Sequence, residues 1–435
     1  MNDTLAATSS TQLDNGCLTG ADTHTSPRRA PMTTRFARTA VLKSLDKLQH
    51  GHLTLIDGGD VSTAGDEAEK TQRATLTVHD SSFYSRVLFG GSLGVAEAYM
   101  DGLWSCDHLT ALIRIFAPKL EASNALDRGW SWLKGRLASG YHAFRPNTRR
   151  GARRNIHEHY DLGNEFFSLF LDETMMYSSA LFESPDVSLH DASVAKLDRI
   201  CRKLQLQPGD HVLEIGTGWG GFAEHAARNY GCRVTTTTIS REQFDFAQNR
   251  IDKAGLSEQV ELLLEDYRDL TGQYDKLVSI EMIEAVGHKF FDTYFKTCGR
   301  LLKPDGLMLL QGITLPDQRY QQYLRSVDFI QRYIFPGGCL PSLKAMGDSV
   351  ASQTDMRMLH LEDLAPHYAQ TLSCWRDRFF DRIDEVRELG FSDRFIRMWE
   401  YYFCYCEAAF LERATGVVQL LLAKPQCHLD PIRTF

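Results

Sequence analysis

The stretch Val212-Leu213-Glu214-Ile215-Gly216-Thr217-Gly218-Trp219-Gly220-Gly221 decides the fold of this chain. An apolar strand that carries a carboxylate runs into closely spaced glycines, and a helix is predicted to begin near Phe222. Glycine lacks a Cβ atom, so the backbone can turn tightly and approach a ligand. The start of the helix offers free N–H groups. This pattern is typical of the first turn of a doubly wound, Rossmann-like α/β sheet, where nucleotide-like cofactors bind at the carboxyl ends of the strands.

The choice between a dinucleotide and a methyl donor depends on acidic residues. Gly216, Gly218 and Gly221 also satisfy the dinucleotide pattern. That pattern requires an acid at the end of the second strand, about 20 residues on, but Arg233–Ser240 contains none. Glu214 lies two residues before the first glycine, where it can bind the amino-acid part or the ribose of S-adenosylmethionine. The sequence therefore predicts a methyl-donor site; a glycine-rich turn without a ligand is the alternative.

Composition indicates a globular enzyme. The chain has 435 residues, of which 43% are hydrophobic, enough for one large or two smaller domains. A formal net charge of −8 argues against a nucleic-acid partner. No apolar stretch approaches the roughly 20 residues that span a bilayer, and the N-terminal residues lack the pattern of a secretory signal. Ten cysteines without zinc-type spacing predict no metal site and reduced thiols, as in a cytoplasmic protein.

The chain is predicted to divide into four parts. Residues 1–32 are rich in Ser and Thr and are expected to be disordered. Residues 33–144 form a smaller mixed accessory domain. Residues 145–155 carry five arginines, which fit both a solvated linker and a patch that attracts an anionic membrane surface. Residues 156–435 form the α/β domain with the glycine turn.

Hydrophobic patterns predict the elements of both domains. The smaller domain has strands over 53–56 and 74–78, a loop over 57–60, and helices around 82–88 and 109–116. The larger domain has helices over 193–204 and 241–254 and further strands over 260–264, 274–280 and 306–311. Such alternation implies a largely parallel sheet. The aromatic-rich region 320–368 does not fit it, and we predict an inserted cap over the pocket.

Several separated motifs resemble the cyclopropane fatty acid synthases and the related mycolic acid cyclopropane synthases. The resemblance runs from about Leu76 to Phe410 and implies a Rossmann-like class I methyltransferase sheet with an inserted substrate cap. The matching segments are His159–Asn164 with Phe166 and Phe167, Met176–Ser178, Glu214–Gly221, Thr238–Gln243, Tyr333–Gly338 and Leu340–Ser342. Gly91–Gly94 and Tyr99–Gly102 are similar to the accessory domain of the phospholipid-acting branch.

The resemblance implies methyl transfer from S-adenosylmethionine to the cis double bond of an unsaturated phospholipid acyl chain, giving a cyclopropane fatty acid. An alkene is a weak nucleophile, so it must be held in line with the sulfonium methyl group. The resulting carbocation requires a dry, apolar pocket, and a base must then remove a proton from the transferred methyl group. The resemblance also implies a cytoplasmic protein peripheral to the inner face of the membrane, and a homodimer formed through the N-terminal region.

The resemblance assigns the cofactor site residue by residue. The glycines line the methionine and ribose portions, and residues after the second and third strands contact the adenosine. A segment before the first helix closes over the donor. The predicted cofactor-binding residues are Tyr177, Ser178, Glu214, Gly216, Gly218, Gly220, Thr238, Ile239, Gln243, Asp266 and Tyr267.

In this family the base is thought to be a bound bicarbonate, and the sequence departs from the family at its ligands. Glu284 matches the acidic ligand, Ile313 matches a residue that offers its backbone, and Tyr368 matches the hydroxyl donor. Ser179 stands where the family usually has cysteine, and Gln311 where it has histidine. These five residues are the predicted catalytic set.

The departures, which include Ala285 in place of a histidine, leave two interpretations open. Serine and glutamine still donate hydrogen bonds, so bicarbonate can remain bound. Alternatively the base is altered, and the product is a methyl- or methylene-branched or a methylated unsaturated chain. Glu284 is the predicted key acid under both interpretations.

A small-molecule methyltransferase and a non-catalytic lipid-binding protein are the rival function classes. The aromatic cap disfavours the first, and the intact glycine turn disfavours the second.

Overall fold

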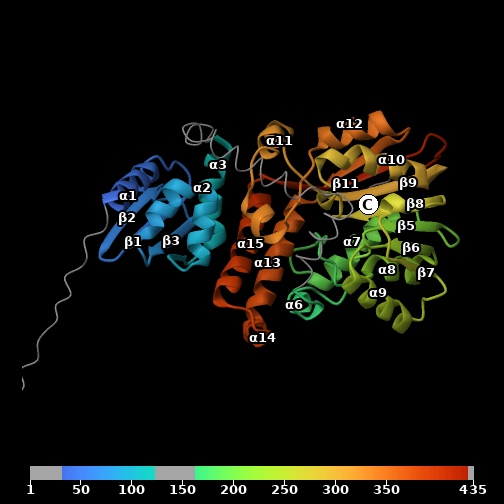
Figure 1. Ribbon diagram of the computed structural model, residues 1–435, viewed down its shortest axis with the longest axis horizontal. Coiled ribbons are helices and arrows are strands. Elements are labelled where there is room, and N and C mark those ends of the chain that lie inside the picture. The colour runs from blue at the N-terminus through green and yellow to red at the C-terminus, as the bar shows by residue number, and fades with distance from the viewer. Residues whose placement is uncertain (1–31, 123–161, 430–435) are drawn as a thin grey trace, which may run out of the picture.

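The computed structural model describes residues 32–122 and 162–429 (Figure 1). The predicted disordered terminus lies outside these ranges, except that Met32 begins the first helix. The predicted basic linker, residues 145–155, and the start of the motif at His159 also lie outside them. Figure 1 shows the described N-terminal residues as a separate small unit beside a large α/β unit.

The N-terminal unit is a small mixed α/β arrangement, as predicted. Its four-stranded sheet has the order β2-β1-β3-β4, in which β1 and β3 are parallel. The predicted loop over 57–60 is the tight turn of a β1–β2 hairpin, and β2 was missed because its mostly exposed residues show no apolar alternation. The elements are α1 (Met32–Leu45), β1 (His52–Asp57), β2 (Asp60–Gly65), β3 (Arg73–Val78), α2 (Ser82–Met100), β4 (Trp104–Cys106) and α3 (Leu109–Ala122).

The large unit is built on a seven-stranded sheet with the order β10-β11-β9-β8-β5-β6-β7. Neighbours from β9 to β7 are parallel, and β11 is antiparallel to both of its neighbours. The chain order reverses between β5 and β8, so this sheet has its switch point there, where ligands bind at the carboxyl ends of the strands. The strands are β5 (His211–Ile215), β6 (Arg233–Thr237), β7 (Val260–Leu263), β8 (Tyr274–Ile280), β9 (Leu302–Thr314), β10 (Arg357–Asp363) and β11 (Gly416–Ala423).

Helices cover both faces of this sheet (Figure 1). One face packs against α7 (Leu189–Lys203), α8 (Gly221–Tyr230) and α9 (Arg241–Ala254). The other packs against α10 (Phe291–Leu301) and α12 (Leu343–Gln353). Serine side chains cap α7, α9 and α12 by accepting a hydrogen bond from a backbone N–H in the first turn. The predicted α/β class and the parallel sheet are confirmed.

A layer of helices separates the sheet from the N-terminal unit. It is formed by α13 (Ala365–Asp381) and α15 (Asp393–Leu411), with α14 (Ile383–Glu388) between them in the chain and α6 (Asn164–Ser168) nearby. The N-terminal unit packs on α15: Tyr99 donates to Glu400 over 2.6 Å, and Thr110 donates to Glu407 over 2.8 Å. These bonds fix the N-terminal unit against the helical layer.

The region predicted as a cap, 320–368, serves two purposes. Its first half, with α11 (Asp317–Tyr323) and a short π-helical turn (Ile330–Ile334), borders the cavity described below. Its second half returns to the sheet, because α12 covers one face and β10 pairs with β11 as an edge strand. The cap is therefore shorter than the sequence predicted. No helix among the described residues is long and apolar enough to cross a membrane.

Candidate active site

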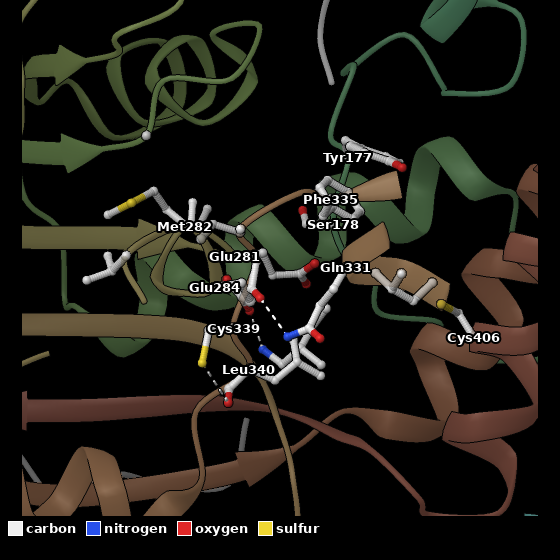
Figure 2. A pocket seen from close by; sticks show the side chains of 18 of the residues that line it. Tyr177, Ser178, Glu281, Met282, Glu284, Gln331, Phe335, Cys339, Leu340 and Cys406 are labelled. Carbon is white, nitrogen blue, oxygen red and sulfur yellow. Dashed lines mark hydrogen bonds between the residues drawn. The ribbon is translucent and has the colours of Figure 1, made fainter. Parts of the chain in front are cut away.

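A cavity of about 510 Å³ opens at the carboxyl ends of β5 and β8. The cofactor residues predicted from the sequence line it, with the exception of Gly220. Of the predicted catalytic residues, Glu284, Ile313 and Tyr368 line the cavity, whereas Ser179 and Gln311 lie behind its wall. Figure 2 shows Tyr177, Ser178, Glu281 and Glu284 together in this space. The structure thus brings segments from distant parts of the chain to one site.

The glycine turn has the backbone that the sequence required. Gly216, Gly218 and Gly220 have φ values of 104°, 52° and 83°, in the region that favours glycine. A Cβ atom at Gly218 would meet nothing within 4 Å, so this residue faces open space in the cavity. A Cβ atom at Gly220 would lie 3.1 Å from that of Ala247. Gly220 therefore serves the contact between α8 and α9, while Gly216 and Gly218 shape the cavity.

Glu214 places a buried carboxylate beside the glycine turn. Its side chain accepts a hydrogen bond of 2.6 Å from Thr236, which also contacts Thr217 over 2.7 Å. Burial raises the pKa of Glu214 to about 8, against the opposing effects of the Thr236 hydrogen bond and the charge of Lys196. A buried acid of this kind gains most from a cationic ligand.

The residues after β6 and β7 form a second wall. Thr238 donates to the side chain of Gln243 over 2.9 Å, which fixes the start of α9, and Ile239 lies beside them at the cavity surface. Asp266 forms an ion pair of 2.6 Å with Arg268, so its carboxylate is held by the guanidinium group. Tyr267 follows it and lines the cavity. These residues form one continuous part of the cavity lining.

The segment before α7 forms the third wall and is tied to α7 by a buried lysine. Lys196 has no exposed surface and donates to the hydroxyl of Ser178 over 2.9 Å. Burial lowers the pKa of Lys196 to about 8, although the charges of Glu281, Asp172 and Glu214 oppose this effect. Sequence analysis did not identify Lys196. Its spacing on the apolar face of α7 was the available signal.

The predicted catalytic donors converge on a residue that was not predicted. Tyr368 donates to Oε2 of Glu281 over 2.6 Å, and the side-chain amide of Gln311 donates to Oε1 over 2.8 Å. The backbone N–H of Ser179 donates to the same oxygen over 2.9 Å. The hydroxyl of Ser179 instead donates to the carbonyl of Ala180. We call these three groups, Ser179 N, Gln311 Nε2 and Tyr368 Oη, the donor cluster.

Glu284 lies next to Glu281 in the cavity (Figure 2) but has a different environment. Its Oε1 accepts a hydrogen bond of 2.5 Å from the backbone N–H of Ile313, and its Oε2 has no hydrogen-bond partner. Burial, and then the charge of Glu281, raise the pKa of Glu284 to about 8, against the Ile313 hydrogen bond. The unpaired oxygen and the neighbouring charge therefore favour the protonated form of Glu284.

The far side of the cavity is apolar and aromatic. Phe335, Tyr402 and Phe410 line it, and Tyr177 packs on Phe335 and on Trp375. Trp399 and the other large aromatic rings of α13 and α15 are mainly buried in the core cluster behind this wall. This arrangement separates a polar half, with the glycine turn and carboxylates, from an apolar half that suits a hydrocarbon chain.

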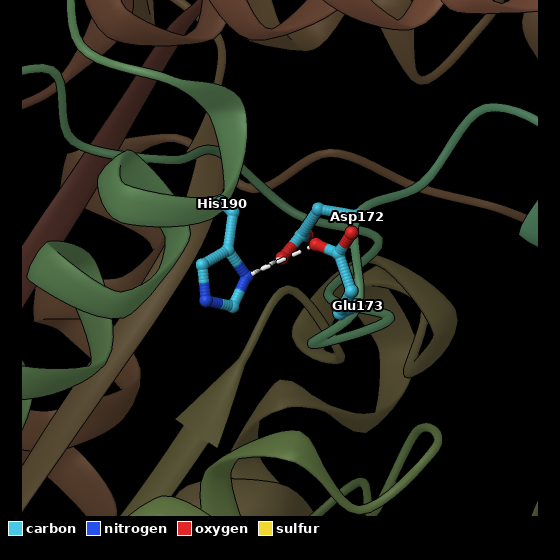
Figure 3. Close-up of side chains that lie close together, drawn as sticks. All are labelled: Asp172, Glu173 and His190. Atoms are coloured by element: carbon cyan, nitrogen blue, oxygen red, sulfur yellow. Dashed lines mark hydrogen bonds and ion pairs between the residues drawn. The ribbon is translucent and has the colours of Figure 1, made fainter.

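A group of potential metal ligands lies outside the cavity lining. Asp172, Glu173 and His190 bring one ligand atom each within 4.8 Å of one another (Figure 3). Both oxygens of Asp172 already accept hydrogen bonds, from the backbone and hydroxyl of Thr174 and from Ser193. This group therefore anchors the turn that leads to the third cavity wall.

The site fits S-adenosylmethionine but does not fit an additional anion. The glycines leave open space beside β5, and the nearby buried acids complement a sulfonium and an ammonium group. The donor cluster, in contrast, is engaged by Glu281, and a bicarbonate there would meet the carboxylate. The cavity offers a site for the predicted cofactor, whereas the donors that the sequence assigned to bicarbonate hold the carboxylate of Glu281.

Comparisons with known proteins agree with this geometry. The family model for mycolic acid cyclopropane synthetase matches residues 147–420. The tuberculostearic acid methyltransferase UfaA1 of Mycobacterium tuberculosis is 40% identical over 341 residues, covering 77% of this chain and 79% of the relative. The cyclopropane-fatty-acyl-phospholipid synthase of Escherichia coli is 39% identical over 364 residues, covering 84% of this chain and 91% of the relative.

Solved structures lead to the same family. The mycolic acid cyclopropane synthase CmaA1, in complex with SAH and CTAB, superposes with a TM-score of 0.58 at 32% identity, covering 62% of this chain and 98% of that structure. With the glycine turn, the buried Glu214 and the cavity at the switch point, these matches establish the family. The chain belongs to the cyclopropane synthase family of S-adenosylmethionine-dependent methyltransferases.

Proposed function

We propose that this protein transfers a methyl group from S-adenosylmethionine to the cis double bond of an unsaturated phospholipid acyl chain, and that loss of a proton then closes a cyclopropane ring. The observation that carries the proposal is a single cavity with buried carboxylates on its cofactor side and aromatic rings on the other. The Escherichia coli relative, which acts on phospholipid acyl chains by its name, supports this substrate.

The chain's own residues meet the requirements of this reaction. S-adenosylmethionine would supply an electrophilic methyl group on its sulfonium. The glycine turn lies close to the segment that carries Glu281. A Cβ atom at Gly216 would lie 3.2 Å from the side chain of Met282, the residue after Glu281. Phe335 and Tyr402 offer an apolar surface that excludes water from a developing carbocation. Aromatic faces add roughly 0.5–2 kcal/mol each when they lie against a desolvated cation.

A second product is supported by specific observations. The relative at 40% identity is named for tuberculostearic acid, and the base site of this chain departs from the family at Ser179, Gln311 and Ala285. The same methyl transfer, followed by a hydride shift where needed and by loss of a proton from the transferred methyl group or from the chain, gives a methylene-branched or a methyl-branched unsaturated product. We propose it as the alternative outcome at the same site.

We also propose where the enzyme is located and how it associates. A phospholipid substrate requires approach to a membrane surface, so we propose a peripheral, cytoplasmic enzyme that the positive charge of the arginines in residues 145–155 attracts to anionic lipid. A homodimer through the N-terminal unit remains part of the proposal. Flotation with vesicles of increasing anionic content tests the first point, and analytical ultracentrifugation tests the second.

The assay combines purified protein, S-adenosylmethionine and liposomes of a cis-monounsaturated phospholipid. Mass spectrometry measures the gain of one carbon in the acyl chain, and proton NMR identifies the product. Upfield ring protons establish the cyclopropane, and vinyl protons establish the branched or methylated unsaturated alternative. Absence of any gain, in protein that binds S-adenosylmethionine, would contradict a phospholipid substrate.

A further inference from the structure

Glu281 occupies the place that the family resemblance assigns to a bound bicarbonate. The three members of the donor cluster bind its two oxygens over 2.6–2.9 Å. A carboxylate and a bicarbonate present the same planar pair of oxygen atoms to hydrogen-bond donors. The side chain of Glu281 therefore fills the anion position with an anion that belongs to the chain.

The backbone at Glu281 shows that this placement is enforced. Its φ is 47°, a left-handed conformation that costs a residue with a Cβ atom on the order of 1–2 kcal/mol. The conformation is held because its N–H donates to the carbonyl of Gln311 over 2.7 Å, directly after β8 ends. Such conformations persist where the surroundings over-determine them, and they concentrate at active sites.

The surroundings also decide which of the two neighbouring acids is charged. Burial raises the pKa of Glu281, but the donor cluster and the charge of Lys196 oppose this. Glu284 accepts one hydrogen bond, and burial together with the charge of Glu281 raises its pKa and favours its protonated form. Tyr368 and Tyr402, the other titratable groups that face Glu281, stay neutral because burial raises their pKa. Two acids with separated roles are the expected signature of an acid–base site.

We propose that the carboxylate of Glu281, in place of a bound bicarbonate, is the base that removes the proton from the transferred methyl group. This inference rests on the proposed function. The alkene's π electrons form the new C–C bond as the methyl–sulfur bond breaks, with its electron pair left on sulfur. Glu281 then takes a proton from the methyl group, and the released C–H electron pair bonds to the cationic carbon. The proton leaves Glu281 to water after the product departs.

Two substitutions of Glu281 and one control test this role. Glu281→Gln keeps the shape but removes the basic oxygen. Glu281→Gly removes the side chain, relieves the left-handed backbone and leaves the donor cluster open to an external anion. Glu258→Gln makes the same chemical change at an exposed position. All are assayed for lipid methylation in buffer freed of carbon dioxide, with and without added bicarbonate, after circular dichroism confirms folding.

We expect wild type and Glu258→Gln to be fully active without bicarbonate and insensitive to its addition. Glu281→Gln should lose about 10²–10⁴-fold in turnover, the range for a general base, with no recovery. Glu281→Gly should lose a similar factor and recover at least tenfold with bicarbonate. Wild-type turnover that depends on bicarbonate, or Glu281→Gln within tenfold of wild type, would overturn the inference while leaving the proposed function intact.

A binding measurement without any lipid shows whether bicarbonate binds at the donor cluster. The melting temperature and the ¹³C NMR line width of labelled bicarbonate are followed for wild type and Glu281→Gly. The inference expects bicarbonate to bind Glu281→Gly and not wild type. Binding to wild type would overturn it. If wild type methylates no phospholipid, the proposed function fails, and this comparison still shows whether Glu281 replaces the anion.

Discussion

Tyr368→Phe tests how the site controls the charge of Glu281. The substitution removes a 2.6 Å hydrogen bond to the carboxylate and keeps the ring, which stacks on Phe410 with centroids 4.5 Å apart. A hydrogen bond to a charged group contributes about 1.5–3 kcal/mol. One pKa unit corresponds to about 1.4 kcal/mol, so the pKa of Glu281 should rise by about 1–2.

The direction of the pKa change depends on which form of Glu281 the Tyr368 hydrogen bond stabilises. The Tyr368 hydroxyl favours the ionised carboxylate, so its loss favours the protonated form. A base must be ionised to act, and activity is therefore lost as the pH falls below its pKa. We expect the acid limb of the kcat profile of Tyr368→Phe to move to higher pH by about 1–2 units, with turnover largely restored on the alkaline side.

A matched control separates this effect from a general loss of stability. Tyr230→Phe also removes a tyrosine hydroxyl that donates to a carboxylate, Asp198, but Tyr230 is not among the cavity-lining residues. Its acid limb should coincide with that of wild type. If the limb of Tyr368→Phe also stays in place, or moves to lower pH, Glu281 is not the group whose ionisation controls turnover.

Three further substitutions probe the cofactor side of the cavity, and Gly255→Ala is the control for the second. Glu214→Gln should weaken S-adenosylmethionine binding by about 10- to 100-fold in calorimetry, because a cationic ligand favours the ionised form of Glu214 and an amide cannot ionise; unchanged affinity would remove Glu214 from the site. Gly218→Ala and Gly255→Ala both place a Cβ atom in open space at left-handed φ, so each should cost about 1 kcal/mol of stability in urea denaturation. Only Gly218→Ala should weaken S-adenosylmethionine binding. Equal affinities of the two variants for S-adenosylmethionine would contradict the role of the glycine turn in cofactor binding. Lys196→Met should lower the free energy of unfolding by about 1–3 kcal/mol, because it removes the 2.9 Å hydrogen bond to the buried hydroxyl of Ser178; an unchanged free energy of unfolding would show that this bond does not stabilise the third wall.

The fold was predictable because local signals agreed with one another. Glycines after an apolar strand, followed by a helix, specified the turn after β5, and the regular alternation of patterns specified the parallel sheet. Four strands were missed: β2 carries little apolar alternation, β4 has only three residues, and β10 and β11 lie in and after the region predicted as a cap, outside the regular alternation of strands and helices. Most of the predicted cofactor residues lie at or just after the carboxyl ends of β5, β6 and β7, so the topology placed them together.

The base site was only half predictable. Ser179, Gln311 and Tyr368 were identified as ligands of one anion, but nothing local showed which anion they bind. Glu281 carried one signal, an acid directly after β8, and the nearby Glu284 matched the family motif instead. Its left-handed backbone depends on pairing between β8 and β9, which is a property of the tertiary structure.

The most direct test follows the hydrogen atoms of the transferred methyl group. Wild-type protein is given S-adenosylmethionine with a fully deuterated methyl group and cis-monounsaturated phospholipid, in buffer freed of bicarbonate, and the acyl chains are analysed by mass spectrometry. If Glu281 removes a proton from the transferred methyl group, turnover proceeds and the product keeps two of the three deuterium atoms. A product that keeps all three, or turnover that begins only when bicarbonate is added, would contradict the account.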